Sequence, residues 1–165
     1  MADSGSIVLT ASILPEEYRK TFTNEIFSYT PADATEGWYI QITNVTTTSG
    51  DLLGDETISK KAGLAVGGSK AEAAATDLCK FLFIKNTGTT NGTNSTTDSV
   101  YICLDAGTAA HNLADSIEIP AGMSWYARLP STQKQNIHAI AGQANAAGTG
   151  GGNVQCIVGA IIDDV

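Results

Sequence analysis

The chain contains two histidines and three cysteines, the residue types that most often carry nucleophilic catalysis or bind transition metals. A serine or cysteine hydrolase needs a nucleophile that a positioned histidine activates. His111 lies in an Asn-containing loop and His138 alternates with apolar residues, and neither accompanies a nucleophile motif. We therefore expect no catalytic residue, with His111 in solvent and His138 on a strand surface or in an interface.

The cysteines are spaced too widely for a structural metal site. Cys79, Cys103 and Cys156 are separated by 24 and 53 residues, with no histidine beside any of them. Zinc sites use closely spaced pairs of cysteine and histidine ligands. Three cysteines cannot all pair within one chain, and each lies in an apolar run. We expect buried free thiols in a protein made in a reducing cytoplasm.

Two glycine-rich stretches and three acidic pairs are the remaining candidates for ligand chemistry. Residues 63–70 have a glycine spacing like that of a phosphate-binding loop, but the final serine and lysine stand in inverted order. The glycine run at 148–152 lacks the strand-to-helix context of a dinucleotide site. No acidic pair has calcium-loop spacing; the pairs are Asp51/Asp55, Asp115/Glu118 and Asp163/Asp164. We expect neither a cofactor nor a metal.

The charge balance argues against other classes of partner. The chain has 165 residues, of which 17 are acidic and 9 basic, so its net charge is −8. Such a surface repels the phosphate backbone of nucleic acids. The N-terminus has no cationic stretch before an apolar core, and no apolar run is long enough to span a bilayer. We expect no nucleic-acid partner, no membrane association and no export by a standard signal peptide.

Short apolar runs separated by turn residues predict β-strands throughout residues 37–165. In the first of them, Trp38, Ile40 and Ile42 alternate with Tyr39, Gln41 and Thr43. Further strands are expected at 78–86, 100–104, 117–119, 123–129, 137–141 and 154–162. In the segment 78–86, expected at the centre of the core, Cys79, Phe81 and Phe83 oppose Leu82 and Ile84. Residues 117–119 and 123–129 are expected to be antiparallel neighbours.

The segments between these strands are rich in small and polar residues. Residues 50–75 are predicted to be mostly loop, with a short helix at 71–75, and residues 87–97 form an exposed hairpin-like loop. The strand spacing predicts an all-β fold, a β-sandwich. Jelly-roll and immunoglobulin-like connections both satisfy the pattern, and we expect a jelly-roll-like sandwich.

The first 36 residues carry mixed signals and are predicted to form an N-terminal arm ahead of a sandwich domain at 37–165. Residues 6–14 are a strand candidate or an extended arm. The charge order of residues 16–20, directly after Pro15, favours a short helix. Residues 22–29 are ambiguous and end before Pro31.

Four segments carry a resemblance to a known class of proteins. They are residues 80–88 (KFLFIKNTG), 100–105 (VYICLD), 117–122 (IEIPAG) and 153–164. Over residues 76–165 the chain resembles virion proteins of tailed bacteriophages, and it is similar in style to capsid decoration or cement proteins. In that class, β-sandwich or jelly-roll domains sit on the assembled shell, commonly as trimers.

The resemblance implies a non-enzymatic virion structural protein that binds and stabilises the assembled capsid. The implied partner is the major capsid protein, and the implied form is a homotrimer on the capsid surface, synthesised in the host cytoplasm. Candidate interface residues are the aromatics Trp38, Tyr101, Trp125 and Tyr126. The alternative is a tail or fibre component that binds host-surface carbohydrate, with Trp38, Trp125 and Tyr126 as a sugar-stacking platform.

Overall fold

The computed structural model describes residues 5–12, 21–29, 36–54, 57–59, 70–72, 74–142 and 151–163. The chain divides into two units, Met1–Asp33 and Ala34–Val165. We call them the N-terminal unit and the body. The sequence-based boundary, after residue 36, lies three residues beyond this division.

The N-terminal unit contains an antiparallel β-hairpin. Its strands are β1 (Gly5–Ser12) and β2 (Thr21–Tyr29), and their register places Ile7 opposite Phe27. The strand candidate at 6–14 is thus a strand as far as Ser12, with residues 13 and 14 outside the described residues, and the ambiguous segment at 22–29 is also a strand. Both are rich in β-branched and aromatic residues, which favour extended backbone. The short helix expected at 16–20 lies outside the described residues.

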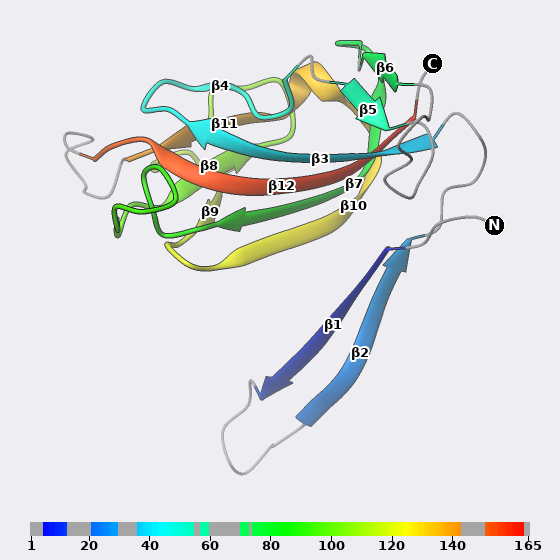
Figure 1. Cartoon of the computed structure of the whole chain (residues 1–165), viewed down its shortest axis with the longest axis horizontal. Helices are drawn as coiled ribbons and strands as arrows, with labels where there is room; N and C mark the ends of the chain where they lie inside the picture. Colours follow the sequence, from blue (N-terminus) through cyan, green and yellow to red (C-terminus); the bar gives the residue numbers. More distant parts are fainter. Residues whose placement is uncertain are drawn as a thin grey trace. The chain divides into compact units, whose positions relative to one another are not determined.

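The body consists of two antiparallel sheets. The six-stranded sheet has the order β10-β7-β12-β3-β5-β6, and the four-stranded sheet has the order β4-β11-β8-β9. Its elements are β3 (Glu36–Val45), β4 (Gly50–Asp51), β5 (Thr57–Ser59), β6 (Lys70–Glu72), β7 (Leu78–Asn86), β8 (Val100–Cys103), β9 (Ile117–Ile119), β10 (Ser124–Gln133), the 3-10 helix η2 (Lys134–Asn136), β11 (His138–Ala141) and β12 (Val154–Asp163). The long strands β3, β12, β7 and β10 run side by side (Figure 1). The prediction of an all-β fold is confirmed.

Side chains from both sheets meet in one hydrophobic core. Every second residue of β12 is fully buried, as the alternation predicts; these residues are Val154, Cys156, Val158, Ala160 and Ile162. The four-stranded sheet contributes Val100, Ile102 and Ala139 to the same cluster. Two sheets that share one apolar interior form a β-sandwich.

Strand β7 lies between β10 and β12, within the six-stranded sheet. Its alternation is interrupted, because Cys79 joins Leu82 in the core although a strict two-residue period would place it with Phe81. The register between β7 and β12 shifts at this point. Such an irregularity moves the residues on one side of it to the opposite face of the strand.

Two local predictions are wrong. Residues 117–119 and 123–129 are not neighbours, because β9 pairs with β8 and β10 pairs with β7. The turn between them crosses from one sheet to the other; a turn signal reverses the chain without fixing which strands pair. The expected helix at 71–75 is also absent, and Lys70–Glu72 instead forms β6, paired with β5. Five residues are too few for a stable helix.

Candidate functional site

The face of the six-stranded sheet that points away from the core carries several large apolar side chains. The register places Ile42 of β3 opposite Ile157 of β12, and it aligns Ile40, Gly159, Phe83 and Tyr126 across four strands. Directly opposed residues lie on the same side of a sheet. We call this surface the outer face and define it by Ile40, Ile42, Phe83, Tyr126 and Ile157.

The isoleucines of the outer face are unusually open to solvent. Ile40 is 74% exposed, Ile42 65% and Ile157 36%, and among the described residues Leu113 and Met123 are the other exposed large hydrophobics. Single exposed apolar residues are common, whereas neighbouring ones mark contact sites. The outer face is therefore the candidate functional site, as a surface for another protein.

Strand β3 orients its side chains against the hydropathy pattern. Tyr39 and Val45 are buried, whereas Ile40 and Ile42 face solvent. Tyr39 can be buried together with its hydroxyl, because the hydroxyl donates a hydrogen bond to the side-chain oxygen of Gln41. A sheet that places isoleucine outside and tyrosine inside has an apolar surface on both sides.

A glycine occupies the middle of the outer face. In the register, Gly159 lies between Ile40 and Phe83. A Cβ atom there would lie 3.8 Å from the Phe83 side chain, an ordinary van der Waals contact. A methyl group would therefore fit at this position without displacing Phe83. The open part of the face ends at Phe81 and Ile161, which are 5% and 0% exposed.

Basic residues lie on β7 and β10 at the outer face. Lys85 shares the row of Ile157, and Arg128 follows two residues after Tyr126 on β10. The Nζ atom of Lys85 donates to the carbonyl of Gly122 at 3.2 Å. These strands thus bring positive charge to the outer face of a chain whose net charge is −8.

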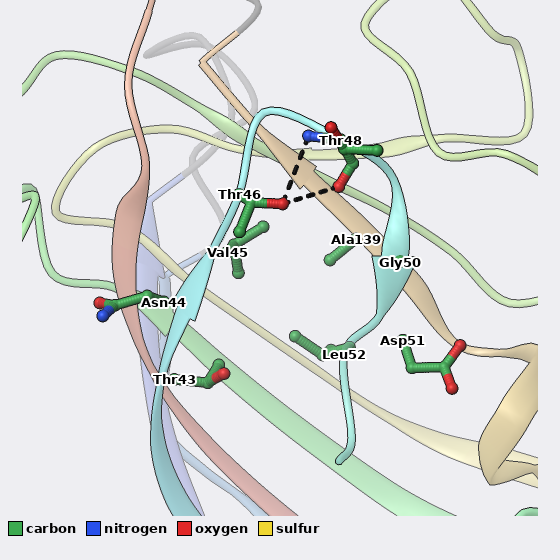
Figure 2. Close-up of a pocket in the computed structure, with 9 residues that line it drawn as sticks. All are labelled: Thr43, Asn44, Val45, Thr46, Thr48, Gly50, Asp51, Leu52 and Ala139. Atoms are coloured by element: carbon green, nitrogen blue, oxygen red, sulfur yellow. Dashed lines mark hydrogen bonds between the residues drawn. The ribbon is translucent and has the colours of Figure 1, made fainter.

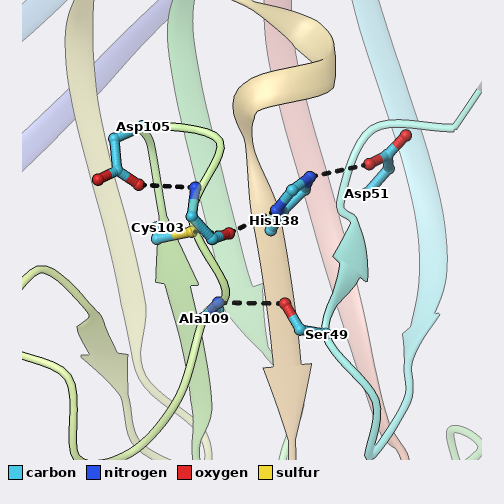
Figure 3. Close-up of polar contacts among 7 residues, drawn as sticks. Ser49, Asp51, Cys103, Asp105, Ala109 and His138 are labelled. Carbon is cyan, nitrogen blue, oxygen red and sulfur yellow. Dashed lines mark hydrogen bonds and ion pairs between the residues drawn. The ribbon is translucent and has the colours of Figure 1, made fainter.

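His138 of β11 contacts the neighbouring strand β4 and the loop after β8 (Figure 3). Its Nε2 atom lies 3.2 Å from Oδ1 of Asp51, and its Nδ1 atom lies 2.5 Å from the carbonyl oxygen of Gly107. The Sγ atom of Cys103 donates to the same carbonyl at 3.0 Å. A cysteine, a histidine and an aspartate, the residue types of a catalytic triad, therefore lie close together.

This arrangement lacks an activated nucleophile. Cys103 is fully buried, and its thiol donates to a backbone carbonyl. Burial raises the pKa of the Cys103 thiol above its ordinary value, whereas a reactive cysteine needs a lowered pKa and access to solvent. Because a carbonyl can only accept, Nδ1 of His138 donates to Gly107. The cluster therefore holds the loop at Gly107 against the four-stranded sheet.

The other two cysteines are fully buried in the core. All three are free thiols, as predicted. Burial raises the pKa of Cys79 and of Cys156 to about 12, from an ordinary value of 9.0. Above pH 9 the unfolded chain loses these protons while the folded chain keeps them. The stability that depends on the buried neutral thiols is therefore complete below pH 9 and falls as the pH rises toward 12.

A shallow hollow lies beside β3 and β4 (Figure 2). Its volume is about 90 Å³, and its lining consists of Thr43, Asn44, Val45, Thr46, Thr48, Gly50, Asp51, Leu52 and Ala139. The hydroxyl of Thr46 donates to the Thr48 carbonyl at 3.0 Å. Pockets for small-molecule ligands measure about 300–1,000 Å³. This hollow is therefore of a size for a few water molecules.

The aromatic residues predicted at an interface lie in different environments. Tyr101 is 8% exposed; its hydroxyl donates to Oε1 of Glu118 at 3.3 Å, and its ring meets His111 edge-on at 6.3 Å. Burial raises the pKa of Tyr101, and the negative charge of Glu118 adds to the shift. Most of this side chain is covered by the chain's own residues.

Trp125 and Tyr126 are both half-buried but point to opposite sides of β10. Trp125 packs against the core, and Tyr126 belongs to the outer face. Trp38 lies on β3, in register with Ile161, and its side chain lies outside what the structure describes. Consecutive strand residues alternate between faces, so no single surface of β10 presents both aromatic rings. The interface role of these residues stays a prediction.

The remaining motifs of the sequence concern metals, membranes and glycine-rich loops. Within the described ranges, no group of three or more His, Cys, Asp or Glu residues is arranged to hold a metal ion. No helix in the part of the chain that the structure covers is long and apolar enough to cross a membrane. The glycine-rich stretches at 63–70 and 148–152 lie largely outside the described residues.

In comparisons with known proteins, no family model, no curated sequence and no solved structure matches the chain. Inference about its function therefore starts from its residues and from the geometry of its two sheets.

Proposed function

We propose that this chain is a non-enzymatic structural protein of a tailed-bacteriophage virion that binds and stabilises the assembled capsid. Its sequence segments at 80–88, 100–105, 117–122 and 153–164 support this class by resemblance. The observation that carries the proposal is the outer face, because a sheet surface with exposed isoleucines suits contact with another protein. The proposed partner is the major capsid protein.

The exposed isoleucines set the strength of one such contact. Complete burial of an isoleucine side chain is worth roughly 1.5–3 kcal/mol. Ile40, Ile42 and Ile157 begin 74%, 65% and 36% exposed, so their burial contributes about 3–5 kcal/mol. That is a weak contact in isolation. Repetition over a symmetric shell and within a homotrimer converts weak contacts into stable attachment.

The proposed mechanism is stabilisation by mass action. A protein that binds the assembled shell but not free coat subunits adds its binding free energy to the stability of the shell. In this proposal the protein is made in the host cytoplasm and ends on the capsid surface. A jelly-roll connection of the sandwich belongs to the same proposal; it is supported by the chain passing repeatedly between the two sheets from β7 to β12.

Cosedimentation with empty capsids tests the proposal. The wild-type protein should bind saturably and raise the temperature at which capsids open, and the Ile40→Asp/Ile42→Asp variant should bind at least about tenfold more weakly. Met123→Asp is the matched control, because Met123 is 58% exposed but lies outside the outer face. Capsids equally resistant to heat with and without the protein would contradict the proposal. Binding to host polysaccharide alone would favour the tail or fibre alternative.

A further inference from the structure

We propose that the outer face of the six-stranded sheet is the docking surface for the β1–β2 hairpin of a second copy of this chain. The inference rests on the proposed function in one respect: the hairpin covers the outer face of the free protein, and the capsid replaces it when the protein binds the shell. Each copy supplies one hairpin and one outer face, so the exchange is reciprocal or closes in a ring.

The β1–β2 hairpin needs an apolar surface from outside its own two strands. An isolated two-stranded hairpin is marginally stable in water, and β1 and β2 belong to a unit distinct from the body. The register pairs Ile7 with Phe27 and, next to them, Val8 with Ile26. Consecutive cross-strand pairs alternate between the two faces of a hairpin. Apolar positions therefore occur on both of its faces, and a stable hairpin requires one face to be covered.

The dimensions of the hairpin match those of the outer face. Strands β1 and β2 have 8 and 9 residues, which at about 3.3 Å per residue gives roughly 26–30 Å. Strands β3 and β12 have 10 residues each, or roughly 33 Å by the same rise. A hairpin packed face to face on these strands can cover Ile40, Ile42 and Ile157 together.

The charges of the two surfaces are complementary. The two strands of the hairpin carry one charged residue, the acidic Glu25 on β2. The outer face carries Lys85 and Arg128 on β7 and β10. Opposite charges favour this pairing and raise its rate of formation. The strands of the hairpin contain no basic residue that would repel Lys85 and Arg128.

Exchange between copies follows from the repetition expected of an assembling protein. When identical chains exchange an identical element, symmetry repeats every contact, so one pair of complementary surfaces is enough to join all copies. A hairpin and an outer face on every copy provide both halves of a head-to-tail interface. Among the described residues, the hydrophobic core of the body draws on both of its sheets.

Crosslinking between two single-cysteine variants tests the occupant directly. One variant carries Ile42→Cys on the outer face and the other Glu25→Cys on β2. The native cysteines are buried, so a short bismaleimide should join the two variants into a covalent heterodimer when they are mixed. As a control, Leu113→Cys, exposed on the loop between β8 and β9, should give no heterodimer with Glu25→Cys. If Ile42→Cys and Leu113→Cys crosslink equally to Glu25→Cys, the proposal is overturned.

The oligomeric mass, measured by light scattering without capsids, provides a second test. The wild-type protein should self-associate, and Ile40→Asp/Ile42→Asp should raise the dissociation constant at least about 100-fold. Met123→Asp should leave it within about twofold. Unchanged circular dichroism would show that the double variant still folds. A wild-type protein that stays monomeric would overturn the inference. A Glu25→Cys/Ile42→Cys variant that crosslinks only within one chain would overturn it as well.

Failure of this inference and failure of the proposed function give different results. A monomeric protein that still binds capsids saturably would refute hairpin exchange and leave the capsid-binding proposal standing. A protein that exchanges hairpins but binds no capsid would do the reverse.

Discussion

Asn86 is fully buried at the end of β7, and its side-chain amide joins three backbone segments. Its Nδ2 atom donates to the carbonyls of Asp98 at 2.9 Å and Ile119 at 3.1 Å, and its Oδ1 atom accepts from the Gly88 amide at 2.9 Å. Asn86→Ala removes all three hydrogen bonds. At about 1 kcal/mol net for each, the free energy of unfolding should fall by about 3 kcal/mol.

Urea unfolding followed by tryptophan fluorescence measures this loss. Asn94→Ala is the matched control, because Asn94 is exposed in the loop after β7, and its cost should stay below about 0.5 kcal/mol. A loss below about 1 kcal/mol for Asn86→Ala, with an unchanged dependence on urea concentration, would refute the reasoning. It would mean that water replaces the amide at little cost.

Three further predictions concern the core, a loop contact and a tight turn. Between pH 9 and 10 the free energy of unfolding should fall more steeply with pH in the wild type than in Cys79→Ala/Cys156→Ala. The difference in slope should be up to about 1.4 kcal/mol per pH unit for each thiol. Equal slopes in urea melts at several pH values would contradict the conclusion that burial keeps these thiols protonated. His138→Ala should cost about 1–2 kcal/mol in thermal unfolding, because the Gly107 carbonyl loses one of its two donors and the contact of His138 with Asp51 is also lost; no loss would show that His138 does not hold the loop at Gly107 in place. Gly142→Ala should destabilise the protein well beyond Gly122→Ala. Both glycines have a positive φ, +79° and +77°, but only at Gly142 would an added Cβ lie as close as 2.8 Å to a backbone carbonyl oxygen, that of Gly152. Equal costs in urea melts would show that the backbone at Gly142 shifts to make room.

Sequence periodicity predicted the strands of the body where one face of a strand meets the core. The alternation from Val154 to Ile162 is an example, because all five inward positions of β12 are fully buried. Periodicity does not identify the partners of a strand. For that reason the turn at Pro120 was expected to make a hairpin, whereas the chain crosses there between sheets.

The candidate site was the least predictable part of the chain. In β3 the alternation separates Ile40 and Ile42 from Tyr39, and hydropathy favours the isoleucines for the interior. The structure buries Tyr39 instead. Which set faces inward depends on the neighbours across the sheet and on the facing sheet, and neither is encoded locally. The register irregularity that places Cys79 in the core also depends on neighbouring strands. The pairings of β7 with β10 and with β12 both shift at this point.

The position of β12 in the six-stranded sheet bears on how the chain folds during synthesis. This strand lies between β7 and β3. Its pairing with β3 joins residues as far apart in the sequence as Ile42 and Ile157. The ribosome therefore releases the central strand after every other strand of the sheet. Until then β3 and β7 have unpaired edges, which invite aggregation. Contacts this distant in sequence also slow folding, so the nascent body should depend on chaperones that shield strand edges until β12 inserts.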